Sequence, residues 1–277
     1  MQLNRRRLGV LGHPIAHSRS PAIHTAAFEA LGIGGEWSYE ALDIEPDEFA
    51  ERTAALPADG FVGANVTVPH KRAALALADR ASESAIEIGA ANTLSFENGE
   101  IVADNTDAPG LLAALPQSPE GGRALVLGAG GVARAAVWAL VGAGAEVEIW
   151  NRTAERAREL AAELGGNAID AEGPLPIGEF DLVVNSTAVG LEHPGAERDP
   201  VSTLEALHLP PSGGFRPGQV VVDLVYGSAD TELIAAAREA GATTVDGLEV
   251  LVRQGAASFR IWTGVDPPLD VMREAAR

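Results

Sequence analysis

Residues 124–133 read Ala-Leu-Val-Leu-Gly-Ala-Gly-Gly-Val-Ala, a short apolar run followed at once by a glycine cluster. The cluster Gly128-Ala129-Gly130-Gly131-Val132-Ala133 fits the pattern G-x-G-x-x-G/A, and an alanine-rich helical stretch follows it. A strand before and a helix after the glycines are the context that dinucleotide binding requires. The glycines allow a tight turn and a close approach of the main chain to a pyrophosphate, which the N-terminus of the helix attracts. These residues predict an α/β fold with a Rossmann-type unit built on a parallel sheet.

The next predicted strand covers residues 146–150. The residues that follow this strand indicate which nucleotide is bound. A protein that binds NAD usually has Asp or Glu there to accept a hydrogen bond from the ribose 2′-hydroxyl. This chain has Asn151, Arg152 and Thr153 instead, with Arg156 one helical turn further on. Guanidinium groups pair well with a phosphate dianion, so Arg152 and Arg156 predict NADP(H) as the cofactor, with Asn151 and Thr153 as neighbouring candidate cofactor contacts. The alternative is that Arg152 and Arg156 are solvated residues at the start of a helix.

The rest of the chain alternates short apolar runs with stretches rich in Ala, Leu, Glu and Arg, which is typical of βαβ units. Asn98-Gly99 between two apolar runs predicts a hairpin, and a helix is expected to begin near Pro69. The character changes after Asp107. We therefore expect a substrate-binding domain over residues 1–107 and a nucleotide-binding domain over 108–246, with 247–277 packing back on the first. Residues 192–217 are rich in Pro and Gly, and we expect a long surface loop there.

Composition limits the possible partners. The 277 residues carry a formal net charge of −19, which repels nucleic acid and anionic membranes. No window is apolar enough to span a membrane, and no apolar core of a signal peptide follows the first basic residues. The absence of cysteine excludes disulfides and thiolate metal sites and fits a cytoplasmic protein. The six histidines show no metal-ligand spacing. We expect no metal, nucleic acid or membrane partner, and a monomer or homodimer.

Lys71 is the only lysine among the twenty basic residues of the chain. Arginine does not give up its proton in a protein, whereas an ammonium group taken out of water can. A chain that uses arginine elsewhere and keeps lysine here therefore indicates a position that must transfer a proton. The alternative is a coding bias that removed lysine elsewhere and left one by chance.

Three polar clusters lie outside the nucleotide unit, each at the predicted end of a strand or helix. They are Ser18-Arg19-Ser20, Asn65-Val66-Thr67, and Asn92-Thr93 with Asp104-Asn105-Thr106-Asp107. Hydroxyl, amide and carboxylate groups in this combination suit a small polyhydroxylated ligand. Each cluster has a structural alternative, since Ser or Thr could cap a following helix and Asn could be a turn residue. Taken together, the clusters favour a ligand site.

These motifs occur in the same order in a known family. Residues 12–21 (Gly-His-Pro-Ile-Ala-His-Ser-Arg-Ser-Pro), 63–71 (Gly-Ala-Asn-Val-Thr-Val-Pro-His-Lys), 89–93 and 104–107 resemble the shikimate dehydrogenase family. So do the glycine cluster, Asn151-Arg152-Thr153, residues 223–226 (Asp-Leu-Val-Tyr), Asp246-Gly247 and Gln254. The segments 63–71 and 104–107 are the most specific. His13 departs from the pattern, because the family usually has Asn there.

The resemblance implies the NADPH-dependent reduction of 3-dehydroshikimate to shikimate, a step of aromatic amino acid biosynthesis. It implies that Lys71 and Asp107 form the catalytic pair, and that Leu224 and Gly247 line the nicotinamide. The residues implied to hold the carboxylate and hydroxyls of the substrate, beside that pair, are Ser18, Ser20, Asn65, Thr67, Asn92, Tyr226 and Gln254.

Two other functions stay open at this point. The first is a quinate/shikimate dehydrogenase with relaxed use of substrate and cofactor. The second is a regulator that binds NADP on the same fold without catalysis, although such a protein would be expected to have lost Lys71 or Asp107.

Overall fold

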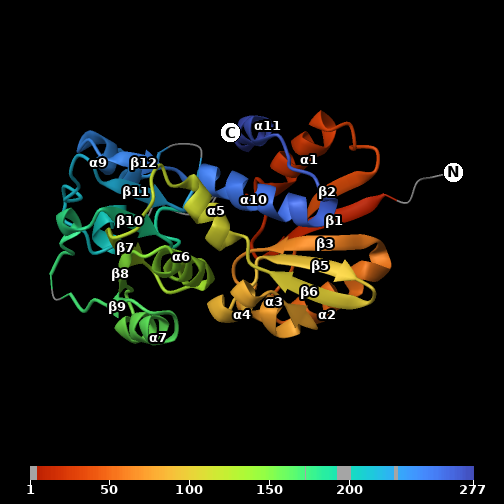
Figure 1. Cartoon of the computed structure of the whole chain (residues 1–277), viewed down its shortest axis with the longest axis horizontal. Coiled ribbons are helices and arrows are strands. Elements are labelled where there is room, and N and C mark those ends of the chain that lie inside the picture. The colour runs from red at the N-terminus through yellow and green to blue at the C-terminus, as the bar shows by residue number, and fades with distance from the viewer. Residues whose placement is uncertain (1–4, 172, 192–200, 228–229) are drawn as a thin grey trace. The chain divides into compact units, whose positions relative to one another are not determined.

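The computed structural model describes residues 5–171, 173–191, 201–227 and 230–277, which form two compact units (Figure 1). The first unit comprises Met1–Gly110 with Leu251–Arg277, and the second comprises Leu111–Val250. The chain passes from the first unit to the second within helix α5 (Asp107–Ala114) and returns within helix α10 (Gly247–Thr263). That the first unit binds the substrate and the second binds the nucleotide stays a prediction.

The first unit is built on a six-stranded mixed sheet in the order β2-β1-β3-β5-β6-β4. Strand β1 is parallel to both of its neighbours, whereas β5 is antiparallel to β3 and to β6. The strands are β1 (Arg6–Gly12), β2 (Trp37–Asp43), β3 (Phe61–Val66), β4 (Arg80–Ala81), β5 (Thr93–Glu97) and β6 (Glu100–Asp104). The sheet is not wholly parallel because the chain reverses directly between β5 and β6.

That reversal is the hairpin predicted at Asn98-Gly99. Asn98 has a φ of 53° and Gly99 a φ of 83°, and a two-residue type I′ turn requires positive values at both positions. The prediction is therefore confirmed. At the other end of the hairpin, Thr93 pairs with Asp104, so the register brings the polar cluster at residues 92–93 to the one at 104–107.

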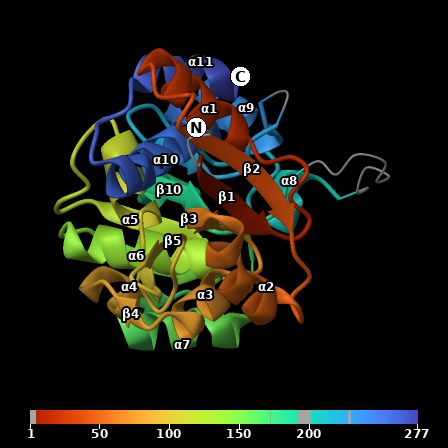
Figure 2. The same ribbon diagram turned by 90° about the vertical axis from the view of Figure 1, so that its right-hand side faces the viewer.

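Helices cover both faces of this sheet. Helices α2 and α3 share one buried core with the strands, in which Phe49 and Ala74 pack with Leu11 and Leu94. Helix α1 and the second half of α10 contribute aromatic rings that stack with those of β2, and Figure 2 shows α11 beside α1. The helices are α1 (Ser20–Ala30), α2 (Phe49–Ala55), η1 (Leu56–Asp59), α3 (Lys71–Leu77), α4 (Glu83–Ile88) and α11 (Leu269–Ala276).

The second unit has a six-stranded, wholly parallel sheet in the order β12-β11-β10-β7-β8-β9. Counted from β7, this is the 3-2-1-4-5-6 strand order of the Rossmann fold, and the predicted fold class is confirmed. The strands are β7 (Arg123–Leu127), β8 (Glu146–Trp150), β9 (Asn167–Ala168), β10 (Leu182–Asn185), β11 (Val220–Asp223) and β12 (Thr243–Val245).

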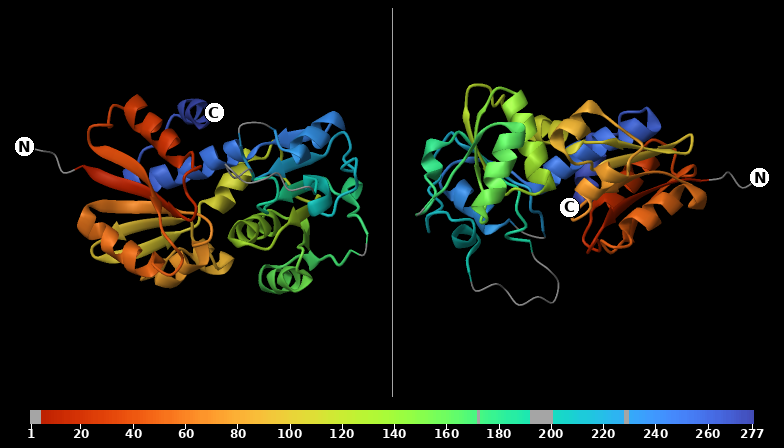
Figure 3. Two further views of the ribbon diagram at one scale, coloured as in Figure 1. Left: turned by 180° about the vertical axis from the view of Figure 1, so that it is seen from behind. Right: turned by 90° about the horizontal axis from the view of Figure 1, so that it is seen from below.

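Successive residues of these strands point to opposite faces of the sheet. Val126 and Val184 belong to the core shared with α6 and α7, two helices that lie side by side in Figure 3. Leu125 and Val183 belong to the core on the other side, shared with α8 and α9. The helices are α6 (Gly131–Gly142), α7 (Ala154–Leu164), η2 (Ile177–Glu179), α8 (Thr203–Ala206) and α9 (Glu232–Glu239). Burial on both faces explains the unbroken apolar runs.

The helix predicted to begin near Pro69 is present: α3 begins at Lys71, after a turn closed by the His70 N–H on the Thr67 carbonyl. The surface loop predicted over 192–217 is wrong in part. Residues 192–200 lie outside the described residues, and the remainder is not wholly a surface loop. It contains α8, whose flanking leucines are buried in the core. Within the described ranges, no helix is both long and apolar enough to cross a membrane.

Candidate active site

The first unit holds one buried amine against a carboxylate. Lys71 is the first residue of α3 and Asp107 the first residue of α5, and the Lys71 Nζ donates to Asp107 Oδ2 over 2.6 Å. The two side chains are 9% and 13% exposed, so water screens the pair little. The ammonium group of Lys71 has three N–H donors, and the bond to Asp107 uses one of them. The other two can donate to a ligand oxygen.

Asn92 and Gln254 complete this cluster. The Asn92 Nδ2 donates to Asp107 Oδ1 over 2.8 Å and lies 3.1 Å from Gln254 Oε1. Asn105, in contrast, has a structural role, because its Oδ1 accepts from the N–H groups of Asp107 and Ala108 in the first turn of α5. Five predicted site residues thus belong to one hydrogen-bonded network: Lys71, Asn92, Asp107, Gln254 and, through the Asn92 carbonyl, Asn65.

The predicted hydroxyl ligands do not cap helices. The N-cap residues of α1 and α3 are Arg19 and His70, and neither helix has a side-chain cap. The Ser18 Oγ accepts from the Ser20 N–H over 3.3 Å, which leaves its own proton for a ligand. The Thr67 hydroxyl makes no hydrogen bond with the residues that the structure describes. The capping alternative is therefore unsupported.

The loops that carry these hydroxyls lie against each other, because β1 and β3 are parallel neighbours and end at the same edge of the sheet. The His13 N–H donates to the Val68 carbonyl over 3.1 Å. A Cβ at Gly12 would lie 2.5 Å from Thr67 Cγ2, so this close approach requires glycine. The edge therefore brings together predicted substrate-binding groups of both loops.

His13 is tied to two carboxylates at this edge. Its Nδ1 lies 2.8 Å from Asp43 Oδ1, and its Nε2 lies 3.2 Å from Glu45 Oε2. The hydrogen bond to Asp43 is the main cause that raises the pKa of His13, and the negative charge of Glu45 adds to it. Burial lowers the pKa of nearby His70, and the charge of His13 lowers it further. Of the two imidazoles, His13 therefore holds a proton more readily than His70.

We expect the stabilisation by His13 to depend on pH. Its folded-state pKa is raised, so the contribution is full below the unfolded value of about 6.5 and is lost as pH rises through the folded value. His13→Gln should lower Tm more at about pH 5.5 than at about pH 9. Thermal denaturation across this range measures the effect. His17→Gln is the control, because His17 lies in the same loop without a described carboxylate partner. A Tm difference for His13→Gln that does not change with pH would contradict the expectation.

In the second unit the glycine cluster forms the turn from β7 to α6. Gly128 has a φ of 114°, and a Cβ there would lie 2.8 Å from Ser186 Oγ. Its N–H donates to the Trp150 carbonyl over 2.7 Å, which ties the turn to the end of β8. Gly130, the N-cap of α6, has no side-chain cap and faces open space. The first turn of α6 is therefore open to a phosphate group.

Arginines without a partner gather at the candidate ligand loops. Most described arginines pair with a carboxylate, as Arg158 on α7 does with Glu155 and Asp170. Those whose side chains make no hydrogen bond, ion pair or ring contact with a described residue are Arg19, Arg72, Arg152, Arg156 and Arg277. Arg152 and Arg156 are predicted site residues, and Arg19 and Arg72 are each adjacent to one. In so acidic a protein, unpaired guanidinium groups provide local positive potential for an anion.

Asp223 organises the strand end that carries the predicted nicotinamide contact. Its buried carboxylate accepts from the Asn185 Nδ2 over 2.9 Å and from the Thr231 hydroxyl over 2.5 Å. Burial raises the pKa of Asp223, and these hydrogen bonds oppose that change. A Cβ at Gly247 would lie 2.7 Å from the Leu224 carbonyl. The structure therefore brings Leu224 and Gly247 together, as the prediction requires.

Two further predicted residues, Asn151 and Tyr226, belong to the second unit. The Asn151 Nδ2 donates to the Thr153 carbonyl over 2.8 Å, which shapes the loop after β8. Tyr226 is half-buried and belongs to the second unit. Its contact with the substrate stays a prediction.

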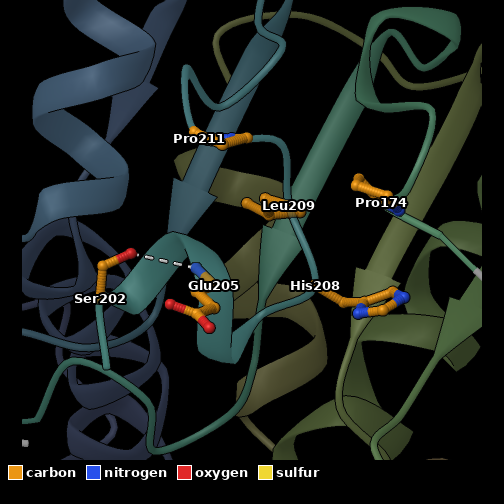
Figure 4. Close-up of a pocket in the computed structure, with 6 residues that line it drawn as sticks. All are labelled: Pro174, Ser202, Glu205, His208, Leu209 and Pro211. Atoms are coloured by element: carbon orange, nitrogen blue, oxygen red, sulfur yellow. Dashed lines mark hydrogen bonds between the residues drawn. The ribbon is translucent and has the colours of Figure 1, made fainter. Parts of the chain in front are cut away.

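A separate hollow on the second unit contains none of the predicted residues. Its volume is about 290 Å³, and Figure 4 shows the residues that line it. The Ser202 Oγ accepts from the Glu205 N–H and caps α8. The His208 ring stacks on Trp150 with the centroids 5.7 Å apart. These contacts are structural, and we assign no ligand to the hollow. Among the described residues, no group of three His, Asp or Glu side chains is placed to hold a metal ion.

Two residues of this architecture were not predicted from the sequence: Tyr39, whose hydroxyl donates to Asn65 Oδ1, and Asp223 in its organising role. Asp223 carries a signal that could have been used, because it follows Val-Val-Val and ends a buried strand. Tyr39 carries none, since its position reads as apolar core.

A Rossmann sheet with an open glycine turn and unpaired arginines occurs here in one chain with a buried Lys–Asp pair. Together they define a nucleotide-dependent oxidoreductase. Three family models match the chain. Residues 10–94 match the shikimate dehydrogenase substrate binding domain, residues 113–204 match shikimate / quinate 5-dehydrogenase, and residues 247–277 match the shikimate 5′-dehydrogenase C-terminal domain.

Known proteins agree with these matches. A shikimate dehydrogenase (NADP(+)) from Thermus thermophilus is 46% identical, over 98% of this chain and 97% of its own. A crystal structure of shikimate 5-dehydrogenase from the same species, in complex with NADP(H) and shikimate, has a TM-score of 0.85 at 44% identity and 98% coverage of both chains. The ligand-free 5-ketofructose reductase of a Gluconobacter species has a TM-score of 0.83 at 32% identity, covering 98% of each chain. The chain belongs to the shikimate dehydrogenase family.

Proposed function

We propose that the chain catalyses the reversible, NADPH-dependent reduction of 3-dehydroshikimate to shikimate, on the route to aromatic amino acids. The observation that carries this proposal is the Lys71 Nζ, buried and 2.6 Å from Asp107 Oδ2. It lies in the unit that contains the match to the substrate-binding domain of the family. The retained pair argues against a regulator without catalysis.

The chemistry requires a proton as well as a hydride. When bound, NADPH supplies the hydride that adds to the ring carbonyl carbon, and negative charge builds on the carbonyl oxygen. The ammonium of Lys71 donates a hydrogen bond to that oxygen and then passes its proton to it. Asp107 holds the amine in place by accepting one of its hydrogen bonds. Such acid–base assistance is worth about 10²–10⁴-fold in rate. In the reverse direction the neutral amine takes the proton of the alcohol.

Hydroxyl and amide groups, together with the carboxylate of Asp107, suit the two ends of the substrate. The hydroxyls of Ser18 and Thr67 lie on the loops after β1 and β3, and that of Ser20 lies on the first residue of α1. We assign the substrate carboxylate to these three hydroxyls. Arg19, which lies between the two serines and has no ion-pair partner among the described residues, adds positive potential there. We assign the ring hydroxyls of the substrate to Asn92, Asp107 and Gln254, with Tyr226 as a further contact.

The second unit provides the groups that NADP needs. We assign the pyrophosphate to residues 128–132 and the first turn of α6, where Gly128 has no room for a Cβ and Gly130 faces open space. The unpaired guanidinium groups of Arg152 and Arg156, with Asn151 and Thr153, would hold the 2′-phosphate. Leu224 and Gly247 would line the nicotinamide.

The assay that tests the function follows reduced-nicotinamide absorbance with the purified full chain. Shikimate, quinate and a sugar such as fructose are each tested with NADP and with NAD. Activity with shikimate and NADP, well above every other pair, is the expected result. Comparable activity with quinate would favour the relaxed quinate/shikimate enzyme, which the description of the matched central segment admits. Binding of NADP without turnover of any substrate would overturn the enzyme assignment. A cytoplasmic location and a monomeric or homodimeric state stay part of the prediction.

A further inference from the structure

We infer that Tyr39 is a positioning residue for the Lys71–Asp107 pair and acts through Asn65. This inference rests on the proposed function. Tyr39 lies on β2, and its hydroxyl donates to Asn65 Oδ1 over 2.8 Å. Tyr39 is 7% exposed and Asn65 4%, so no bulk water competes for this bond.

The orientation of the Asn65 amide is set by its other partners. The Asn65 Nδ2 lies 3.2 Å from the Asn92 main-chain carbonyl and 3.2 Å from Thr93 Oγ1. A carbonyl oxygen only accepts, so the amide must present its nitrogen to Asn92 and its oxygen to Tyr39. Both hydrogens of Asn65 are then used inside the protein. This favours a connecting role for Asn65 over the direct substrate contact that the family resemblance implies.

Hydrogen bonds through Asn92 connect Asn65 to the Lys71–Asp107 pair. Asn65 holds the main chain of Asn92, and the Thr93 hydroxyl that it also contacts donates to Asn92 Oδ1 over 3.2 Å. The Asn92 Nδ2 in turn donates to Asp107 Oδ1 over 2.8 Å, and the other oxygen of Asp107 accepts from Lys71. A continuous set of buried hydrogen bonds thus runs from Tyr39 to the amine, and networks of this kind act as a unit.

The surroundings fix the Tyr39 ring. The His24 ring stacks on it with the centroids 4.2 Å apart and the planes 4° from parallel. Burial lowers the pKa of His24 to about 3, so the imidazole is neutral at any pH of interest and adds no charge beside the network. The Tyr39 hydroxyl can therefore be removed while the aromatic packing is kept.

Ser258 provides a comparison at the same acceptor. Its hydroxyl lies 3.4 Å from Asn65 Oδ1, but it lies 3.0 Å from the Gly255 carbonyl of its own helix. A hydroxyl has one proton, and the shorter contact takes it. Tyr39 is therefore the effective donor, and loss of the Ser258 hydroxyl should matter little.

The experiment measures kcat, KM for shikimate and Tm for Tyr39→Phe. We expect kcat to fall about fivefold to tenfold, the effect of losing one buried hydrogen bond, with KM changed less than about threefold. Trp37→Phe is the matched control, because Trp37 lies two residues earlier on the same face of β2 and stacks with Phe28. Trp37→Phe and Ser258→Ala should keep kcat within about twofold. Unchanged kcat in Tyr39→Phe, with an active wild type, would overturn the inference and leave the proposed function intact.

A double-mutant cycle tests the route through Asn65. If Tyr39 acts only through Asn65, then Tyr39→Phe with Asn65→Ala should lose no more kcat than Asn65→Ala alone. Losses that multiply would show that Tyr39 acts by another path and would overturn the inference. An inactive wild type would contradict the proposed function instead.

Discussion

Replacing Lys71 by arginine is expected to lower kcat by about 10²–10⁴-fold, with little change in KM for shikimate. Arginine keeps a positive charge beside Asp107 but does not release its proton. Lys71→Arg therefore separates proton transfer from charge. Lys71→Ala removes both and should be at least as inactive. Steady-state kinetics with shikimate and NADP measure the two variants.

The control for Lys71→Arg is a basic residue of the same unit that serves only an ion pair. Arg80 contacts Glu100 over 2.7 Å at the surface, with both side chains about half exposed. Arg80→Ala should keep kcat, since exposed pairs contribute little. Near-wild-type kcat in Lys71→Arg would remove Lys71 from the proton transfer.

The double variant Arg152→Ala and Arg156→Ala is expected to raise KM for NADPH by about 10–100-fold and to leave KM for NADH nearly unchanged. Hydrogen bonds to charged groups contribute about 1.5–3 kcal/mol, which corresponds to that range. Only NADPH carries the 2′-phosphate, so the selectivity between the two cofactors should collapse. Steady-state kinetics at a fixed high concentration of 3-dehydroshikimate measure both values.

Arg158 supplies the matched control for the cofactor variants. It lies on the same helix, α7, but its guanidinium is already paired with Glu155 and Asp170. Arg158→Ala should change both KM values equally, if at all. Equal changes for NADPH and NADH in the Arg152 and Arg156 variant would refute the assignment of the 2′-phosphate.

The nucleotide unit could be predicted from the sequence because its signals are local. The strand, the glycine turn and the helix that follows occupy adjacent residues, and the context of Gly128 and Gly130 needs no distant partner. The same holds for the hairpin at Asn98-Gly99, where two residues determine the turn.

Residue patterns alone predicted the candidate site of the first unit only as separate polar clusters, and the family resemblance was needed to join Lys71 with Asp107. The two residues are 36 positions apart, and their contact depends on the order of β3, β5 and β6 in the sheet. The hydrogen bond from Tyr39 to Asn65 depends on the order of β2, β1 and β3 in the sheet. No residue of β2 predicts that order. Long-range register is a property of the whole sheet, so local patterns did not reveal it.

Composition misled the prediction for residues 201–217. Prolines and glycines suggested a loop, but Ser202 caps α8 and Leu204, Leu207 and Leu209 are buried. A serine followed by spaced leucines predicts a helix. The many prolines and glycines around this segment led to the prediction of a loop instead.

The most direct test follows the reduced-nicotinamide absorbance while the wild type and Lys71→Arg oxidise shikimate with NADP across a range of pH. In this direction the amine of Lys71 accepts the proton of the alcohol, which a guanidinium group does not do. The wild type should oxidise shikimate, and kcat of the variant should be about 10²–10⁴-fold lower at every pH tested. A Lys71→Arg enzyme that reproduces the rate of the wild type would contradict the account.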